Sequence, residues 1–276
     1  MITDDQLLAM ASSLCTVPGV RAVVLGGSRA RGTHHAGSDV DLGLYYDRTA
    51  LNLDALTALT TTFSSDGEVT VTGPGSWGPW VNGGGWLTVG DTDVDWILRD
   101  VDRVREQCHK AVQGQFGFHA QPGHPLGFLD VSYAGEAATC RPLSDPDGVI
   151  AELKAIVDPY PHALREAMIA NLWQAEFHVD AASKGLPRQD VAYVMLCCTS
   201  ALMICAHAWH AAAGSWVTNE KGLVVDVATL PIQTHDFSSR AEKALTLPTA
   251  DRDNLAHVIR TTRALVTETI HNIRSR

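Results

Sequence analysis

Short apolar runs alternate with amphipathic stretches through the first half of the chain. Val20–Leu25 is a continuous β-branched run, which predicts a buried strand. Residues 39–45 alternate acidic or small side chains with Val40, Leu42 and Leu44, which predicts a second strand with one buried face. Further elements are predicted as strands at residues 86–89 and 94–98, joined by a turn at residues 90–93, and as helices at residues 51–63 and 100–112.

Local signals describe the rest of this half. Thr3 and Gln6 have the spacing of a helix capping box, so a first helix is predicted to begin there and to end before Pro18. Residues 114–130 are typical of a loop, and residues 129–133 indicate one more short strand.

The apolar period becomes helical in the second half of the chain. Helices are predicted over residues 149–157, 162–184, 190–213, 239–245 and 251–273. The chain is therefore expected to have an α+β architecture, with a mixed domain over residues 1–156 followed by an all-helical domain over residues 157–276.

One of these helices is apolar enough to need a membrane test. Residues 191–213 contain no Asp, Glu, Lys or Arg, and their length could span a bilayer. Thr199, Ser200 and two histidines interrupt the run, and alanine is its commonest residue. A buried helix at the centre of the helical domain is therefore predicted, and no membrane partner is expected.

Composition narrows the class of protein. Hydrophobic residues make up 45% of the chain and charged residues 19%, as in globular proteins. The net charge of −10 argues against binding to extended nucleic acid, which requires a basic surface. The first residues carry Asp4 and Asp5 in place of a basic signal segment, so a cytoplasmic location is expected. The six cysteines lack Cys-x-x-Cys spacing and indicate reduced thiols.

The chemistry is concentrated between residues 26 and 41. Asp39 and Asp41 are two apart on a predicted strand, so their side chains share a face and repel each other unless a cation lies between them. Oxygen ligands of this kind suit Mg²⁺. Gly26 and Gly27 allow a ligand to approach the backbone, and Ser28 begins a predicted short helix whose free N–H groups attract phosphate.

This segment resembles the signature of the DNA polymerase β-like nucleotidyltransferase superfamily, in the branch that contains aminoglycoside nucleotidyltransferases and the minimal nucleotidyltransferases. The resemblance is carried by about 18 residues, in the motifs Leu25-Gly26-Gly27-Ser28, Ala30-Arg31-Gly32 and Ser38-Asp39-Val40-Asp41-Leu42. It implies that the mixed sheet belongs to a polymerase β-like domain and that the second domain is a helical bundle.

The resemblance also implies roles for individual residues. Gly27 and Ser28 would hold the β- and γ-phosphates of a nucleoside triphosphate such as ATP, and Asp39 and Asp41 would bind one or both of two Mg²⁺ ions. The family adds a third carboxylate from a neighbouring strand, for which Asp95 is the best match. Asp93 is its competitor. A further acid often acts as general base, and the unranked candidates are Glu136, Glu176 and Glu220.

Several cations and rings have a functional and a structural interpretation. Arg29 and Arg31 lie beside the predicted phosphate site, and both could simply project into solvent. Arg31 could instead pair with the acidic loop or contact nucleotide. Lys221, and more weakly Lys184, could close over a triphosphate from the helical domain or belong to ordinary polar loops. His207 and His210 are expected to be a packed core pair. Aromatic residues in the Gly-rich stretch could stack on a base or sugar or cover the sheet, namely Trp77, Trp80 and Trp86.

Three functions are compatible with these residues. The first is an enzyme that transfers AMP or another NMP to a hydroxyl of a small molecule, such as an aminoglycoside-like antibiotic, which would make the protein a resistance factor. The second is nucleotidylation of a protein or RNA end. The third is a non-catalytic nucleotide-binding module, against which the presence of all three acids speaks.

Overall fold

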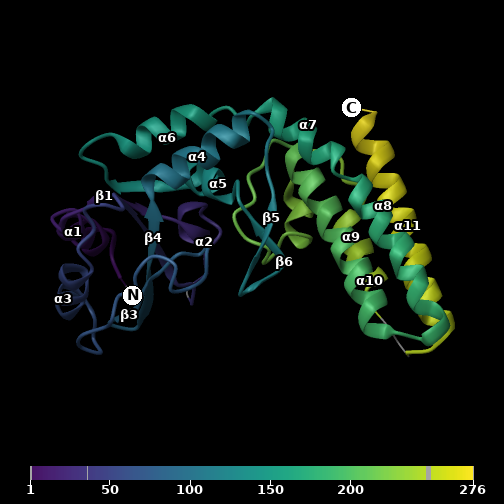
Figure 1. Cartoon of the computed structure of the whole chain (residues 1–276), viewed down its shortest axis with the longest axis horizontal. Coiled ribbons are helices and arrows are strands. Elements are labelled where there is room, and N and C mark those ends of the chain that lie inside the picture. The colour runs from purple at the N-terminus through teal and green to yellow at the C-terminus, as the bar shows by residue number, and fades with distance from the viewer. Residues whose placement is uncertain (1, 36, 247–249, 276) are drawn as a thin grey trace. The chain divides into compact units, whose positions relative to one another are not determined.

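The computed structural model describes residues 2–35, 37–246 and 250–275. The chain forms two compact units (Figure 1). Unit 1 comprises Met1–Ala111 and Phe116–Pro159, and unit 2 comprises Val112–Gln115 and Tyr160–Arg276.

Unit 1 is built on a mixed five-stranded sheet with the order β3-β4-β2-β1-β7. Its central strands β2 and β4 run parallel, and the other neighbouring pairs run antiparallel. The predicted α+β class with a small mixed sheet is confirmed. The strands are β1 (Val20–Leu25), β2 (Val40–Tyr46), β3 (Gly84–Val89), β4 (Thr92–Asp100) and β7 (Arg141–Ser144).

Helices α1 and α3 bury their apolar sides on one face of this sheet. The core on that face takes alternate residues of β2 and β4, among them Leu42 and Trp96, together with Met10 and Leu14 of α1 and Leu56 of α3. The intervening residues of the two strands therefore emerge on the opposite face. The helices of unit 1 are α1 (Asp4–Leu14), α2 (Gly27–Ala30), α3 (Leu53–Phe63), α4 (Val101–Val112), α5 (Ser132–Thr139) and α6 (Val149–Val157).

The segment between α4 and α6 differs from its prediction. The expected loop at residues 114–130 contains a hairpin of β5 (Phe118–Gln121) and β6 (His124–Leu129). The strand expected at residues 129–133 is wrong beyond Leu129. The buried Asp130 carboxylate accepts a hydrogen bond from the N–H of Gly117 (2.9 Å), which closes the hairpin, and α5 begins two residues later.

Every regular element among the described residues of unit 2 is a helix. One long helix was expected over residues 162–184, and this prediction is wrong, because the helix breaks at Asn171 and Leu172. There the carbonyl oxygens of both residues accept hydrogen bonds from the N–H groups three residues further along the chain (3.0 Å each). This shorter spacing interrupts the hydrogen-bond pattern of the α-helix. The elements are α7 (His162–Ala170), α8 (Trp173–Ala182), the 3₁₀ turns η1 (Ser183–Arg188) and η2 (Val225–Thr229), α9 (Val191–Ala212), α10 (Phe237–Ala244) and α11 (Arg252–Arg274).

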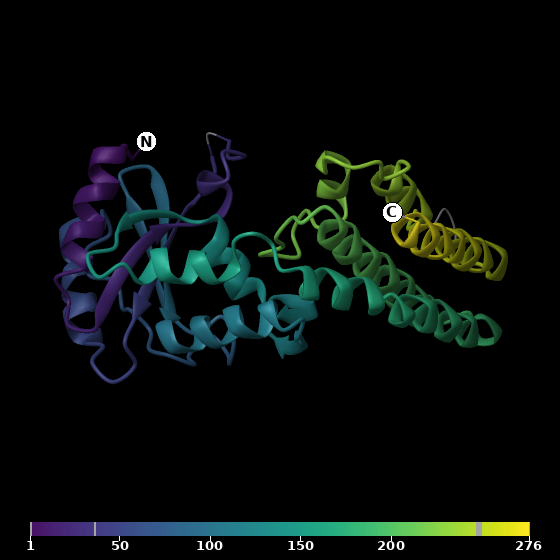
Figure 2. The ribbon, with the colours of Figure 1, turned by 90° about the horizontal axis from the view of Figure 1, so that it is seen from above.

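Helix α9 forms the core of unit 2, as predicted. It begins after Asp190, whose side chain accepts from the N–H of Tyr193 (3.1 Å), and it packs on α7, α8 and α11. Figure 1 and Figure 2 both show α8, α9 and α11 lying side by side. Among the described residues, α9 is the one helix long and apolar enough to cross a membrane by length and composition, and more than half of its apolar window is buried inside the protein.

Candidate active site

Asp41 and Asp95 are direct neighbours in the sheet. The parallel register of β2 and β4 pairs Asp41 with Asp95. Paired residues of adjacent strands have side chains on the same face, and the strands lie about 4.8 Å apart. The next residues, Leu42 and Trp96, are fully buried against α1 and α3, so both carboxylates emerge on the opposite face. The structure thus brings together two of the three predicted aspartates.

Gly27 gives the Asp41 carboxylate its space. A Cβ atom at Gly27 would lie 1.8 Å from Asp41 Oδ2, and the φ angle of Gly27 is +59°. The preceding residue, Gly26, donates its N–H to the carbonyl oxygen of Asp41 (2.8 Å). The turn after β1 is therefore fastened to β2, and only glycine fits at residue 27. The sequence indicated a phosphate-binding role for Gly27, and the structure adds this steric one.

Negative charge accumulates around Asp41. Burial raises the pKa of the Asp41 carboxyl, and the charges of Asp39 and Glu136 raise it further. Arg31 and Arg99 act in the opposite direction and lower this pKa. A cation bound beside Asp41 would relieve the repulsion and hold the carboxyl ionised.

Asp39 lies immediately before β2 and is exposed. Its backbone is held by Arg29, whose Nε donates to the carbonyl oxygen of Asp39 (3.1 Å) and whose Nη2 donates to that of Ser38 (2.8 Å). Arg29 therefore joins α2 to the segment that presents Asp39, instead of projecting freely into solvent.

Asp93 and Asp95 share one face of β4, but their positions differ. Pairing between β2 and β4 begins at Val40 and Val94. Asp95 lies within the paired segment, beside Asp41, whereas Asp93 lies before the paired segment begins. Asp93 is exposed and Asp95 half-buried. These positions favour Asp95 as the third acid.

The predicted phosphate site lies at α2, which has only four residues. Ser28 is half-buried within it, and its carbonyl oxygen accepts from the N–H of Thr33 (3.0 Å). Arg31 follows the helix and is exposed. Because its charge lowers the pKa of Asp41, Arg31 lies within electrostatic reach of the carboxylates.

Glu136 is held by an ion pair that the sequence did not indicate. Arg99 donates two hydrogen bonds to its carboxylate, at 2.6 and 2.8 Å, and the Arg99 side chain is 8% exposed. Burial alone would lower the pKa of Arg99, but the charge and hydrogen bonds of Glu136 raise it. Arg99 lies four residues after Asp95, on the same face of β4. This periodic placement of charge in an apolar strand is the signal that could have revealed it.

Glu136 is the one of the three candidate bases that belongs to unit 1. Both of its oxygens accept from Arg99, which leaves less capacity to take a proton from a substrate. Glu176 is exposed on α8, and Glu220 is half-buried between α9 and η2, both in unit 2.

Lys184 and Lys221 lie near opposite ends of α9. Lys184 precedes Gly185, which packs against Val194. The segment that contains Lys221 returns to the other end, where the Leu223 carbonyl accepts from His210 Nε2 (3.2 Å). Residues 194 and 210 are about 24 Å apart along the helix axis. The structure therefore does not bring the two lysines together.

His207 and His210 are buried in unit 2, as expected for a packed pair. Burial, with a smaller contribution from the charge of His210, lowers the pKa of His207 to about 3. A neutral core imidazole is the consequence.

The aspartates fit a magnesium ion by their chemistry and their position in the sheet. Asp39, Asp41 and Asp95 offer only oxygen ligands, and after burial it is the negative charges of Asp39 and Glu136 that raise the pKa of Asp41. Over residues 2–35, 37–246 and 250–275, no three His, Cys, Asp or Glu side chains are gathered closely enough to hold a metal. The carboxylates would therefore have to turn toward an ion as it binds.

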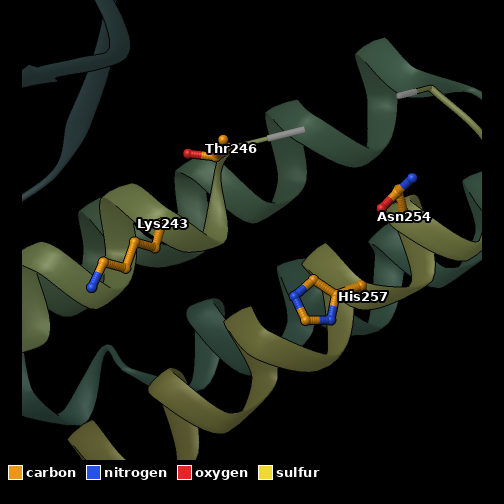
Figure 3. A pocket seen from close by; sticks show the side chains of 4 residues that line it. All are labelled: Lys243, Thr246, Asn254 and His257. Carbon is orange, nitrogen blue, oxygen red and sulfur yellow. The ribbon is translucent and has the colours of Figure 1, made fainter. Parts of the chain in front are cut away.

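A separate cavity of about 510 Å³ lies in unit 2, between α10 and α11. Figure 3 shows the side chains that line it, which are those of Lys243, Thr246, Asn254 and His257. None of these residues was predicted for the site, and they include no carboxylate.

Comparison with known proteins identifies the domain that carries the aspartates. Residues 9–69 match the family model described as a nucleotidyltransferase domain. A search of curated proteins finds no match. Among solved structures, a nucleotidyltransferase-like protein from Exiguobacterium sibiricum is similar over 99% of this chain and 80% of its own, with 10% identity and a TM-score of 0.47. The matched segment includes Gly27, Asp39 and Asp41, so these three residues lie in a nucleotidyltransferase domain.

Proposed function

We propose that the protein transfers a nucleoside monophosphate from a nucleoside triphosphate, with ATP as the first candidate, to a hydroxyl group of a small molecule. The observation that carries this proposal is the pairing of Asp41 with Asp95 beside Gly27. Gly27 and Asp41 belong to the segment that matches the nucleotidyltransferase domain. Pyrophosphate is the second product.

The proposed substrate orientation follows the order of the strands. Gly27 and Ser28, at the end of β1, receive the β- and γ-phosphates, and Arg31 adds positive charge at the same end. The α-phosphate then lies over Asp41 and Asp95, on the neighbouring strands β2 and β4.

The proposed reaction is an in-line displacement at the α-phosphorus. The acceptor oxygen forms a bond to phosphorus, the bond to the bridging oxygen of the β-phosphate breaks, and pyrophosphate leaves with that electron pair. Asp39, Asp41 and Asp95 would hold Mg²⁺, which when bound neutralises charge on the phosphates. Asp95 would also help to remove the proton from the acceptor hydroxyl.

The acidity of the protein supports a cationic acceptor. A net charge of −10 attracts a polyamine compound such as an aminoglycoside. An antibiotic-modifying enzyme is accordingly the first substrate class to test.

The test is a product assay with the full chain. The protein is incubated with Mg²⁺, each of four α-labelled NTPs, and aminoglycosides, lincosamides, bulk protein or tRNA. Release of pyrophosphate together with a labelled small molecule supports the proposal. A labelled protein or tRNA would show that the acceptor is a macromolecule and not a small molecule. NTP binding without pyrophosphate release would indicate a non-catalytic module.

A further inference from the structure

The half-buried Trp77 and the exposed Trp86 form a stacked pair at the edge of the sheet. Their ring centroids are 4.4 Å apart and their planes differ by 9°. Trp86 belongs to β3, which is an edge strand of the sheet, and the residue is 65% exposed. Figure 1 labels β3. Since Trp77 covers one face of the Trp86 ring, the exposed area includes the other face.

Trp80 shows what a structural tryptophan of the same loop looks like. Its ring stacks on His119 at 4.2 Å and on Phe128 at 5.5 Å, and the Arg103 guanidinium lies 4.0 Å from its centroid. The Trp80 ring is therefore packed against other rings and also contacts a positive charge. Trp86 has no comparable cover, although exposing a large indole to water is unfavourable. The difference indicates a ligand-binding role for Trp86.

Trp86 belongs to the same transverse row as the aspartates. The antiparallel register of β3 and β4 pairs Trp86 with Asp95, which is itself paired with Asp41. The next residue, Leu87, is buried on the face covered by α1 and α3. The order across the face opposite α1 and α3 is therefore Gly27, Asp41, Asp95 and Trp86.

The geometry of the displacement determines which substrate reaches Trp86. An in-line reaction requires the attacking oxygen to approach from the side opposite the leaving pyrophosphate. If the pyrophosphate lies at Gly27 and Ser28, the acceptor must come from beyond Asp95, on the β3 side. The nucleoside is attached to the α-phosphorus through an oxygen that lies off the axis of attack. It is therefore not directed along the row of residues that ends at Trp86.

We propose that Trp86, supported by Trp77, is the platform on which a ring of the acceptor stacks. The acceptor is then a hydroxylated ring compound, such as a sugar, whose C–H face meets the electron-rich face of the indole. An ammonium group on the same ring adds a cation–π attraction. This inference rests on the proposed function and specifies its substrate class.

The test separates acceptor binding from nucleotide binding. Wild type and Trp86→Ala are compared in steady-state assays and by saturation-transfer NMR, with kanamycin, spectinomycin, lincomycin and methyl glucoside as ring probes and sorbitol as the acyclic control. Trp86→Ala is expected to raise the acceptor KM about tenfold or more and to leave the KM of the NTP within about twofold. Saturation transfer should reach ring C–H protons in wild type and decline in the variant.

Two further variants serve as controls. Trp86→Phe should restore most of the acceptor affinity, and Trp173→Ala, which removes an indole that is 58% exposed in unit 2, should resemble wild type. An unchanged acceptor KM in Trp86→Ala, a raised NTP KM instead, or ring probes that neither bind nor react while NTP binds would each overturn the platform. Failure of wild type to bind NTP with Mg²⁺ would overturn the proposed function itself.

Discussion

The Asp41 carboxylate lies so close to Gly27 that a single methyl group added there would sit 1.8 Å from Oδ2. Gly27 also has a φ angle of +59°, which disfavours any L side chain. The glycine after β1 is therefore linked physically to the acid on β2. The motif that was predicted to bind phosphate therefore also shapes the carboxylate site.

Replacement of Gly27 by Ala should abolish activity by displacing Asp41. Gly32→Ala is the matched control, because Gly32 has a similar φ of +70° but no atom within 4 Å of an added Cβ. Each variant should lose about 1–2 kcal/mol of stability from the left-handed backbone. Pyrophosphate release should fall at least about a hundredfold in Gly27→Ala only. Equal activity in both variants would mean that Asp41 needs no such space.

Asp41→Asn should separate activity from stability. Loss of the carboxylate is expected to reduce turnover by at least about a hundredfold. The Tm at pH 7 should be equal to or above that of wild type, because the ionised carboxyl is disfavoured by burial and by Asp39 and Glu136. Thermal unfolding with and without Mg²⁺ tests this, since added Mg²⁺ should stabilise wild type more than the variant. A variant that keeps full activity would contradict the assignment.

The pH dependence of stability should show the raised pKa of the Asp41 carboxyl. Its pKa is raised in the folded state, so the unfolded chain releases this proton first, and stability falls as pH rises from the ordinary carboxyl range through the folded pKa. The Tm difference between Asp41→Asn and wild type should therefore grow with pH across this window, and wild-type activity should rise there. A difference that is constant from pH 3 to 8, where ordinary carboxyls titrate from about 4, would exclude a raised pKa.

Asp95→Asn and Asp93→Asn should behave differently. Asp95 is paired with Asp41, so its amide variant should lose activity at least about a hundredfold, whereas Asp93→Asn should retain most of it. Turnover at saturating Mg²⁺ and NTP is the measurement, with circular dichroism to confirm folding. The opposite order would make Asp93 the third acid.

Glu136→Ala should destabilise unit 1. The variant leaves the guanidinium of Arg99 buried without its bidentate partner, which costs about 3 kcal/mol. Glu136→Gln keeps one acceptor and should lose less. Urea unfolding at pH 7 measures the difference, and a loss below about 0.5 kcal/mol in the alanine variant would show that the pair is open in solution.

Local pattern was sufficient to predict the elements around the carboxylates. The alternation in residues 39–45 predicted which face of β2 is buried, and the capping box at Thr3 is present with both of its hydrogen bonds. The parallel pairing that places Asp95 beside Asp41 depends on strand order, which a local period does not encode.

The missed elements depend on distant contacts. Helix α5 contains a glycine and has Ser132 and Thr139 at its two ends, so its local helix signal is weak. The carbonyl oxygens of Ala138 and Cys140 at its C-terminal end accept hydrogen bonds from Lys154 Nζ of α6 (2.8 Å each). Strand β7 contains Pro142 and lies at the sheet edge, where proline is tolerated but the strand signal is weak.

The position of the transferred label distinguishes nucleotidyl transfer from phosphoryl transfer. Wild-type protein, Mg²⁺ and a responsive acceptor are incubated in parallel with NTP labelled at the α- or at the γ-phosphate. Nucleotidyl transfer predicts that α-label moves to the acceptor, that γ-label appears only in pyrophosphate, and that Asp41→Asn produces neither. Transfer of γ-label to the acceptor would show phosphoryl transfer and contradict the account.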